Sequence, residues 1–168
     1  MNKIDGIYIG LGANLPGDAG SPVATLEAVL AGLAAAGIGL LRRSPWYESA
    51  PVPRADEQPW YVNGVIEVAT ALEPAALLAV LQGFEAAAGR MRSVANAARP
   101  LDLDIIAYRG LVHPGPNPPF LPHPRMDARA FVLLPLQAIA PHWRHPVHGR
   151  GVGDLIATLP PGQEIRLL

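Results

Sequence analysis

The chain has 168 residues; half of them are hydrophobic, 16% are charged, and the formal net charge is −1. This length predicts a single domain, residues 1–168, with a substantial core. The lack of a basic excess argues against a general nucleic-acid binder, and the absence of cysteine excludes disulfides and thiol catalysis. The apolar stretches are too short or too interrupted for a signal peptide or a membrane span, so we expect a soluble, cytoplasmic protein.

The first part of the chain alternates short apolar segments with turn-forming residues. Residues 6–12 predict a strand. Ser21 is suited to cap a helix with Pro22 in its first turn, and apolar residues recur after it at helical spacing. Residues 38–48 predict a second strand, and residues 61–70, whose side chains alternate between two faces, predict a third.

The following elements complete a recognisable order. Pro74 opens a second helix with an apolar stripe, and residues 101–108 predict a fourth strand. The order strand–helix–strand–strand–helix–strand is typical of a ferredoxin-like α+β fold, an antiparallel sheet with two helices on one face. Residues 109–168 then form a C-terminal extension, with short helices expected near 134–140 and 153–158.

Two aspartates, Asp102 and Asp104, interrupt the fourth strand and face the same side, because successive side chains on a strand point to opposite faces. Leu101, Leu103 and Ile105 then face the other side. Carboxylates at this spacing lie roughly 6.5–7 Å apart at Cα, so their oxygens can converge on one or two hard cations such as Mg²⁺. The alternative is a solvent-exposed face that carries two charges, and the strand alone does not decide between the two.

Three arginines, Arg90, Arg92 and Arg99, lie just before this strand. Guanidinium groups bind phosphate oxygens in a bidentate manner, so three of them beside a metal-binding pair predict a polyphosphate ligand. Alternatively, Arg90 and Arg92 compensate the dipole at the C-terminal end of the preceding helix, which leaves Arg99 unexplained.

Other motifs carry less weight. The chain has no G-x-x-x-x-G-K-[ST] loop, and its near match to G-x-G-x-x-G has Leu15 at the third glycine position. The element order does not suit a dinucleotide-binding fold either. His142, His145 and His148 have a spacing that would suit a metal site, but neighbouring prolines exclude a continuous helix, and exposed histidines on a loop are the alternative.

Several longer segments together resemble one family. They are, in chain order, IGLGANLPG (9–17), SPWYESAPV (44–52), WYVNGVIEV (60–68), FEAAAGRMR (84–92), RPLDLDIIAY (99–108) and LPHPRMDARAFVLLPL (121–136). By these segments, which span about Ile7 to Leu159, the chain is similar to the 6-hydroxymethyl-7,8-dihydropterin pyrophosphokinases. The resemblance implies transfer of pyrophosphate from ATP to the hydroxymethyl group of the dihydropterin, with release of AMP, in folate biosynthesis.

The resemblance also implies roles for particular residues. Asp102 and Asp104 would bind two Mg²⁺ that bridge the ATP phosphates, and with Arg90 and Arg92 they would form the catalytic group. The residues implied to bind ATP are Gln82, Glu85, Arg90, Arg92, Arg99, Ile105, His123 and Arg129. The residues implied to bind the pterin are Ser49, Ala50, Val52, Tyr61, Asn63 and Phe131, with the rings of Tyr61 and Phe131 on its two faces.

The resemblance implies two small-molecule partners, ATP and 6-hydroxymethyl-7,8-dihydropterin. We expect a monomer that binds neither nucleic acid nor a membrane. The rival interpretation is a non-catalytic ferredoxin-like module with a small-molecule-binding or regulatory role. It predicts binding without metal dependence, and it leaves the paired aspartates and the arginines without a shared purpose.

Overall fold

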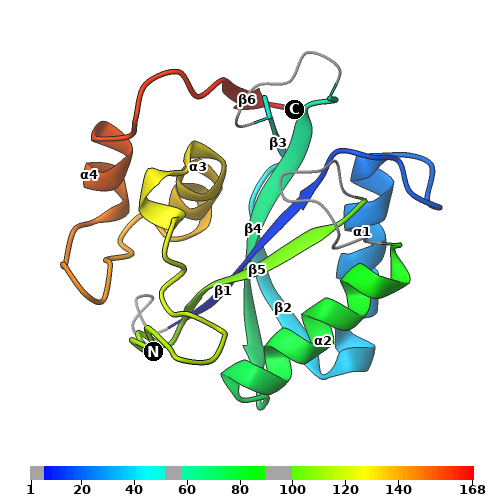
Figure 1. Ribbon diagram of the computed structural model, residues 1–168, viewed down its shortest axis with the longest axis horizontal. Helices are drawn as coiled ribbons and strands as arrows, with labels where there is room; N and C mark the ends of the chain where they lie inside the picture. The colour runs from blue at the N-terminus through cyan, green and yellow to red at the C-terminus, as the bar shows by residue number, and fades with distance from the viewer. Residues whose placement is uncertain (1–5, 52–57, 90–99) are drawn as a thin grey trace.

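The computed structural model describes residues 6–51, 58–89 and 100–168 (Figure 1). Within these residues the elements are, in order, β1 (Ile7–Ala13), α1 (Pro22–Gly32), the 3-10 helix η2 (Ala34–Ala36), β2 (Ile38–Arg43), β3 (Tyr47–Ser49), β4 (Tyr61–Thr70), α2 (Pro74–Ala87), β5 (Asp102–Tyr108), the 3-10 helix η3 (Met126–Ala128), α3 (Ala130–Ile139), α4 (Val152–Ala157) and β6 (Ile165–Leu167). In this part of the chain, every helix is too short or too polar to cross a membrane.

The strands form one antiparallel sheet in the order β5-β1-β4-β3-β6, and β2 pairs with the end of β4 that β3 leaves open. β1 lies between β5 and β4 and is antiparallel to both. With β2 and β3 taken together, this is the strand order of the ferredoxin-like fold. The predicted α+β fold class is therefore confirmed.

The second expected strand, residues 38–48, is wrong in one respect, because it consists of two strands, β2 and β3. The chain leaves the ladder at Pro45, which has no N–H group to donate to a neighbouring strand. Ser44 still holds the chain to β4: its N–H donates to the Val65 carbonyl at 3.0 Å, and its hydroxyl accepts from the Val65 N–H at 3.0 Å. As a result, β4 pairs with β3 near its start and with β2 near its end.

The helices next to the sheet begin where the sequence predicts. The Ser21 hydroxyl accepts from the Ala24 N–H at 3.0 Å, and Pro22 lies in the first turn of α1. α2 likewise begins with Pro74. The C-terminal extension departs further from the prediction, because α3 begins a turn earlier, at Ala130, and the edge strand β6 is an additional element.

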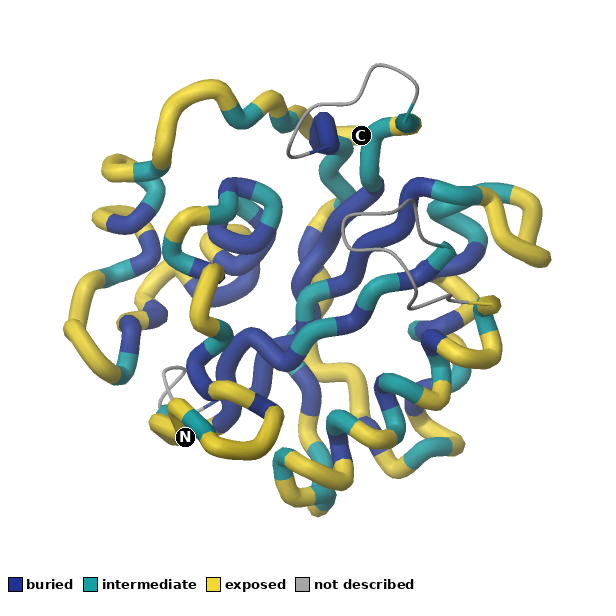
Figure 2. The backbone as a smooth tube through the Cα atoms, in the orientation of Figure 1, coloured by how far each residue is buried: buried dark blue, intermediate teal, exposed yellow. Residues whose placement is uncertain are grey.

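Helices cover the sheet on both sides (Figure 1). α1 and α2 pack on one side, the helix face, where Ile9 and Leu26 belong to a shared core. α3 and α4 pack on part of the opposite side, the extension face, where a second core includes Tyr8, Val65 and Trp143. The central strands are accordingly buried along most of their length (Figure 2).

Strand β5 and the residue before it show the predicted alternation. Leu101, Leu103 and Ile105 are buried in the core of the helix face. Asp102 and Asp104 therefore point to the extension face, at the free edge of the sheet.

Candidate active site

The paired aspartates stand at one end of a row of residues that crosses the extension face. Residues directly opposite each other in neighbouring strands point to the same face. Asp102 lies opposite Gly12, Gly12 lies opposite Asn63, and Asn63 lies opposite Tyr47. The Cα atoms of Asp102 and Asn63 are thus two strand spacings apart, or about 10 Å.

The positions of β1 that lie opposite the aspartates are both glycines. Gly10 lies opposite Asp104, as Gly12 lies opposite Asp102. A Cβ atom at Gly12 would lie only 3.1 Å from Nδ2 of Asn63. Glycine at position 12 therefore leaves room for the Asn63 amide, which a larger side chain there would displace. In the sequence these glycines belong to the near match to a nucleotide-binding motif, but glycine at alternate positions of a strand is itself a signal of a close contact.

Asn63, two strands away from Asp102 in the row, is buried and held by Ser49. The Ser49 hydroxyl donates to Oδ1 of Asn63 at 2.6 Å, and both residues are at most 5% exposed. This bond turns the NH₂ group of the amide toward Gly12. Tyr61 lies opposite Ser49 and shares the extension face with it, and the next residue after Ser49, Ala50, is also buried. The described residues of this region that the resemblance implies for the pterin therefore lie together.

Phe131 lies in the first turn of α3, on the extension face, at the margin of the second core. The Arg129 guanidinium stacks over its ring, with Cζ 5.3 Å from the ring centroid. A cation is attracted to the negative face of an aromatic ring, so this contact joins a residue expected at the nucleotide to one expected at the pterin.

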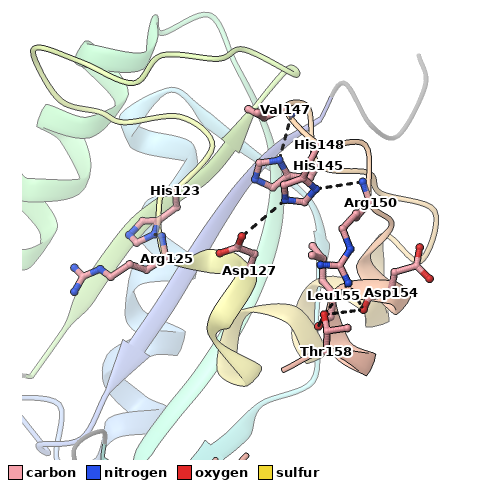
Figure 3. A network of polar contacts seen from close by, with 10 residues as sticks. All are labelled: His123, Arg125, Asp127, His145, Val147, His148, Arg150, Asp154, Leu155 and Thr158. Carbon is pink, nitrogen blue, oxygen red and sulfur yellow. Dashed lines mark hydrogen bonds and ion pairs between the residues drawn. The ribbon is translucent and has the colours of Figure 1, made fainter. Parts of the chain in front are cut away.

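His123 lies close to the aspartates, and its main-chain N–H donates to the Ile106 carbonyl at 2.9 Å. Its Nδ1 accepts from the Arg125 N–H at 3.2 Å (Figure 3), so the neutral ring carries its proton on Nε2. Burial, together with the charges of Arg129 and Arg125, lowers the pKa of His123 to about 4, against the opposing effect of Asp102. At neutral pH His123 is therefore an uncharged N–H donor.

Glu85 closes the free edge of β5 from α2. Its carboxylate is buried, and Oε2 accepts from the Leu103 N–H at 2.9 Å. Gln82, half-buried, lies one turn earlier in α2. The side chain of Ile105 is in the core of the helix face, and strand alternation places its main chain at the same edge as that of Leu103. Any contact of Ile105 with a nucleotide is therefore made by its main chain.

The remaining predicted site residues, Val52, Arg90, Arg92 and Arg99, lie outside the described residues. Within residues 6–51, 58–89 and 100–168, no group of three or more His, Cys, Asp or Glu side chains is arranged for a metal ion. The two aspartates nevertheless suit Mg²⁺, because this ion keeps water and phosphate oxygens as ligands and takes only one or two carboxylates from the protein.

The histidines of the extension do not form the metal site that their spacing allows. His145 and His148 stack, with ring centroids 3.8 Å apart, and His148 Nε2 lies 3.8 Å from Oδ2 of Asp127 (Figure 3). Their Nδ1 atoms accept main-chain N–H groups, from Val147 at 3.2 Å and from Arg150 at 3.3 Å. A cavity of about 480 Å³ lies beside them, between the segments 112–124 and 145–147.

The sequence model of the 7,8-dihydro-6-hydroxymethylpterin-pyrophosphokinase (HPPK) family matches residues 8–141 of the chain. The chain belongs to this family. It is therefore a pyrophosphokinase of folate biosynthesis, which transfers the pyrophosphoryl group to hydroxymethyldihydropterin. The function predicted from the resemblance is confirmed in preference to the non-catalytic module.

Relatives of known name agree with this HPPK assignment. The 2-amino-4-hydroxy-6-hydroxymethyldihydropteridine pyrophosphokinase of Pseudomonas aeruginosa is 39% identical over 158 residues, which cover 94% of this chain and 93% of that protein. The protein of the same name from Methylorubrum extorquens is 37% identical and covers 92% of this chain and 93% of its own length.

Other HPPK relatives are longer. The chain is 34% identical to the folic acid synthesis protein fol1 of Schizosaccharomyces pombe and matches 22% of its length. The structure of Plasmodium falciparum HPPK-DHPS superposes with a TM-score of 0.65 over 90% of this chain, at 14% identity, and the chain spans 44% of it. That superposition shows that the fold is shared.

Proposed function

We propose that the reaction takes place on the extension face, above the row Asp102–Gly12–Asn63, with ATP as the pyrophosphoryl donor. The hydroxymethyl oxygen of the pterin forms a bond to the β-phosphorus, the bond from this phosphorus to the oxygen on the α-phosphorus breaks, and AMP leaves. The hydroxyl proton passes to solvent. The observation that carries the proposal is that one row of the sheet holds an acidic group at one end and a buried, oriented amide two strands away.

The pterin would lie over β3 and β4. The Asn63 NH₂ group, which the bond to Ser49 directs toward Gly12, would donate to an acceptor on the edge of the ring. Tyr61 and Phe131, which reach the same face from β4 and α3, would cover the two faces of the ring. A flat heteroaromatic ring is well held between aromatic faces with polar groups along its rim, and the main chain of Ala50 and Val52 would supply further groups.

The triphosphate would lie over β5. Asp102 and Asp104 would hold two Mg²⁺, which neutralise the charge of the phosphates when bound. His123 would donate from Nε2 to a phosphate oxygen, and Arg129 would add positive charge beside it. The expected ATP residues at the edge of β5 and in the segment before it are Gln82, Glu85, Arg90, Arg92, Arg99 and Ile105.

These groups act mainly by position and charge. An attacking primary alcohol needs alignment with the β-phosphorus more than it needs a strong base, and cationic groups stabilise the charge on the transferred group. The rigid sheet supplies the alignment, because the acidic and amide ends of the row are joined through ladder hydrogen bonds of β1.

One assay tests the proposal. The protein is mixed with ATP, Mg²⁺ and 6-hydroxymethyl-7,8-dihydropterin, and the nucleotide products are separated. We expect AMP, together with loss of AMP formation in Asp102→Ala and a raised pterin KM in Asn63→Ala. ADP as the product would contradict pyrophosphoryl transfer, and unchanged kinetics in both variants would place the site elsewhere.

A further inference from the structure

The C-terminal segment 163–167 contacts both structural elements that carry the proposed pterin residues. One element is β3, which carries Ser49 and leads to Ala50, and the other is the start of α3, which carries Phe131. β6 pairs with β3 so that Ile165 lies opposite Ser49, and the Ala50 N–H donates to the Glu164 carbonyl at 3.0 Å.

Gln163 fixes the start of α3. Its Oε1 accepts from the Ala130 N–H at 2.8 Å, and its Nε2 donates to the Ala128 carbonyl at 2.9 Å. The first N–H groups of a helix have no partner within the helix, and Arg129 at the N-cap makes no side-chain cap. Gln163 therefore replaces the missing cap from a distant part of the chain, next to Phe131.

Arg166 joins the two ends of the connection between β3 and β4. Its guanidinium forms an ion pair with Glu48, which lies in β3, and stacks over the ring of Trp60, with Cζ 4.8 Å from the centroid. Trp60 directly precedes Tyr61, and Glu48 directly precedes Ser49. A single side chain thus holds the residues next to two proposed pterin contacts.

Arg166 cannot itself contact the pterin, because it points to the wrong side of the sheet. In the ladder, Arg166 lies opposite Glu48 and Glu48 lies opposite Val62. Val62 belongs to the core of the helix face, whereas Ser49 shares the extension face with Asn63. An effect of Arg166 on the pterin must therefore pass through the strands that it holds.

We propose that Gln163 and Arg166 are positioning residues for the pterin, which set the distance between the wall formed by β3 and β4 and the wall formed by Phe131. The proposal rests on the pterin site described under Proposed function. Loss of Gln163 leaves the start of α3 less well held, and loss of Arg166 leaves the ends of β3 and β4 less well held. In either case the pterin binds more weakly, while the nucleotide end of the site, on β5, keeps its geometry.

The test is to measure, in Gln163→Ala and Arg166→Ala, the affinity for the pterin and the separate effects on the KM for the pterin, the KM for ATP and kcat. Affinity is measured by calorimetry with 6-hydroxymethylpterin, Mg²⁺ and an ATP analogue that has a methylene group between its α- and β-phosphates. We expect each variant to raise the Kd and the KM for the pterin roughly three- to tenfold, with the KM for ATP and kcat within about twofold. Arg166→Lys, which keeps the charge beside Glu48, should recover part of the affinity.

Arg43→Ala is the matched control. Arg43 also pairs with a glutamate, Glu27, at 2.6 Å and stacks over a tryptophan, Trp46, at 5.2 Å. Its contacts hold α1 and the residue before Tyr47, and not the ends of the connection between Ser49 and Tyr61. Its loss should lower the melting temperature by a similar amount and leave the pterin Kd unchanged. A pterin Kd that rises equally in Arg43→Ala would show that general destabilisation, and not positioning, is the cause.

Asn63→Ala separates this inference from the proposed site. If Asn63→Ala weakens pterin binding while Gln163→Ala and Arg166→Ala do not, the positioning role is wrong and the site stands. If Asn63→Ala leaves pterin binding unchanged, the site itself is wrong. A rise in the KM for ATP equal to that for the pterin would also overturn the positioning role.

Discussion

Ser49 donates a hydrogen bond of 2.6 Å to Oδ1 of Asn63, and this bond joins two buried side chains of neighbouring strands. The bond engages the acceptor atom of the amide, so the donor group is the one left facing the row toward Asp102. Because Oδ1 is engaged, the NH₂ group of Asn63 has a fixed direction and is available to donate a hydrogen bond to a ligand. At the proposed pterin site, specificity would therefore depend on Ser49 through the orientation that it gives to Asn63.

Ser49→Ala should weaken pterin binding about tenfold, because the amide of Asn63 loses its orientation. It should also lower the free energy of unfolding by about 1–3 kcal/mol, the usual effect of leaving a buried polar atom without its partner. Ser44→Ala is the control, since the Ser44 hydroxyl is equally buried and accepts from Val65 N–H. Calorimetry and urea unfolding measure the two effects, and equal pterin affinity in wild type and Ser49→Ala would contradict the orienting role.

Asp102→Ala and Asp104→Ala should each lower the rate of AMP formation by several orders of magnitude and leave the fold intact. The reason is that each removes one of two half-buried carboxylates on the edge strand β5, where the adjacent Leu103 and Ile105 face the other side of the sheet. The measurement is the rate as a function of Mg²⁺ concentration, with circular dichroism for the fold. Asp18→Ala, an exposed aspartate in the turn after β1, should behave as wild type. Wild-type activity of either variant at limiting Mg²⁺ would refute the metal-binding role.

His123 should titrate near pH 4 in the free protein and at higher pH when a triphosphate is bound. Its pKa is lowered from 6.5 to about 4 by burial and by Arg129 and Arg125, and phosphate charge opposes both arginines. NMR of the His123 ring with and without the methylene analogue of ATP measures the change. A pKa that stays the same on nucleotide binding would place the phosphates away from His123.

The same pKa makes a prediction for stability. Between about pH 4 and 6.5 the unfolded chain binds a proton at His123 that the folded chain does not, so this residue makes stability rise with pH in that window. Below pH 4 both states are protonated and the contribution is lost. His123→Gln should flatten this part of the stability profile, which urea unfolding at a series of pH values would measure.

Glu85→Ala should lower the free energy of unfolding by about 1–3 kcal/mol, because it leaves the buried Leu103 N–H without its acceptor. Glu85→Gln keeps an acceptor oxygen and should cost less. If the two variants are equally stable, the bond to Leu103 is not what Glu85 contributes. Binding of the methylene analogue of ATP to both variants then tests the separate expectation that Glu85 contacts the nucleotide.

Local patterns account for much of what could be predicted. Ser21 and Pro22 mark the start of α1 because a cap acts over one helical turn. The face of Asp102 and Asp104 follows from strand alternation, which depends only on parity along the chain. At Pro45 a local pattern was misleading. A proline within a strand is a sign of an interruption, but the alternation of apolar and polar residues on both sides of it favoured one continuous strand.

The arrangement of the site residues relative to each other was harder to predict from the sequence. The resemblance named Asn63 and Ser49, but not the hydrogen bond between them, and it named His123 without its tautomer or its low pKa. Gly12 belongs, in the sequence, to the near match to G-x-G-x-x-G and gives no sign of its place beside Asn63. β6 escaped prediction because a three-residue edge strand is stabilised by its partner β3 and carries little pattern of its own.

By itself, the sequence determined the ferredoxin-like class and the order of its core elements, the family, and the common face of Asp102 and Asp104, because these follow from local periodicity and contiguous motifs. Only the tertiary structure decided that Asp102, Gly12 and Asn63 form one row, that Gln163 contacts the start of α3, and that Arg166 contacts Trp60. The physical reason is register: which residues lie opposite each other depends on how all strands bury their apolar faces together, and a shift by one residue would turn every side chain to the other face.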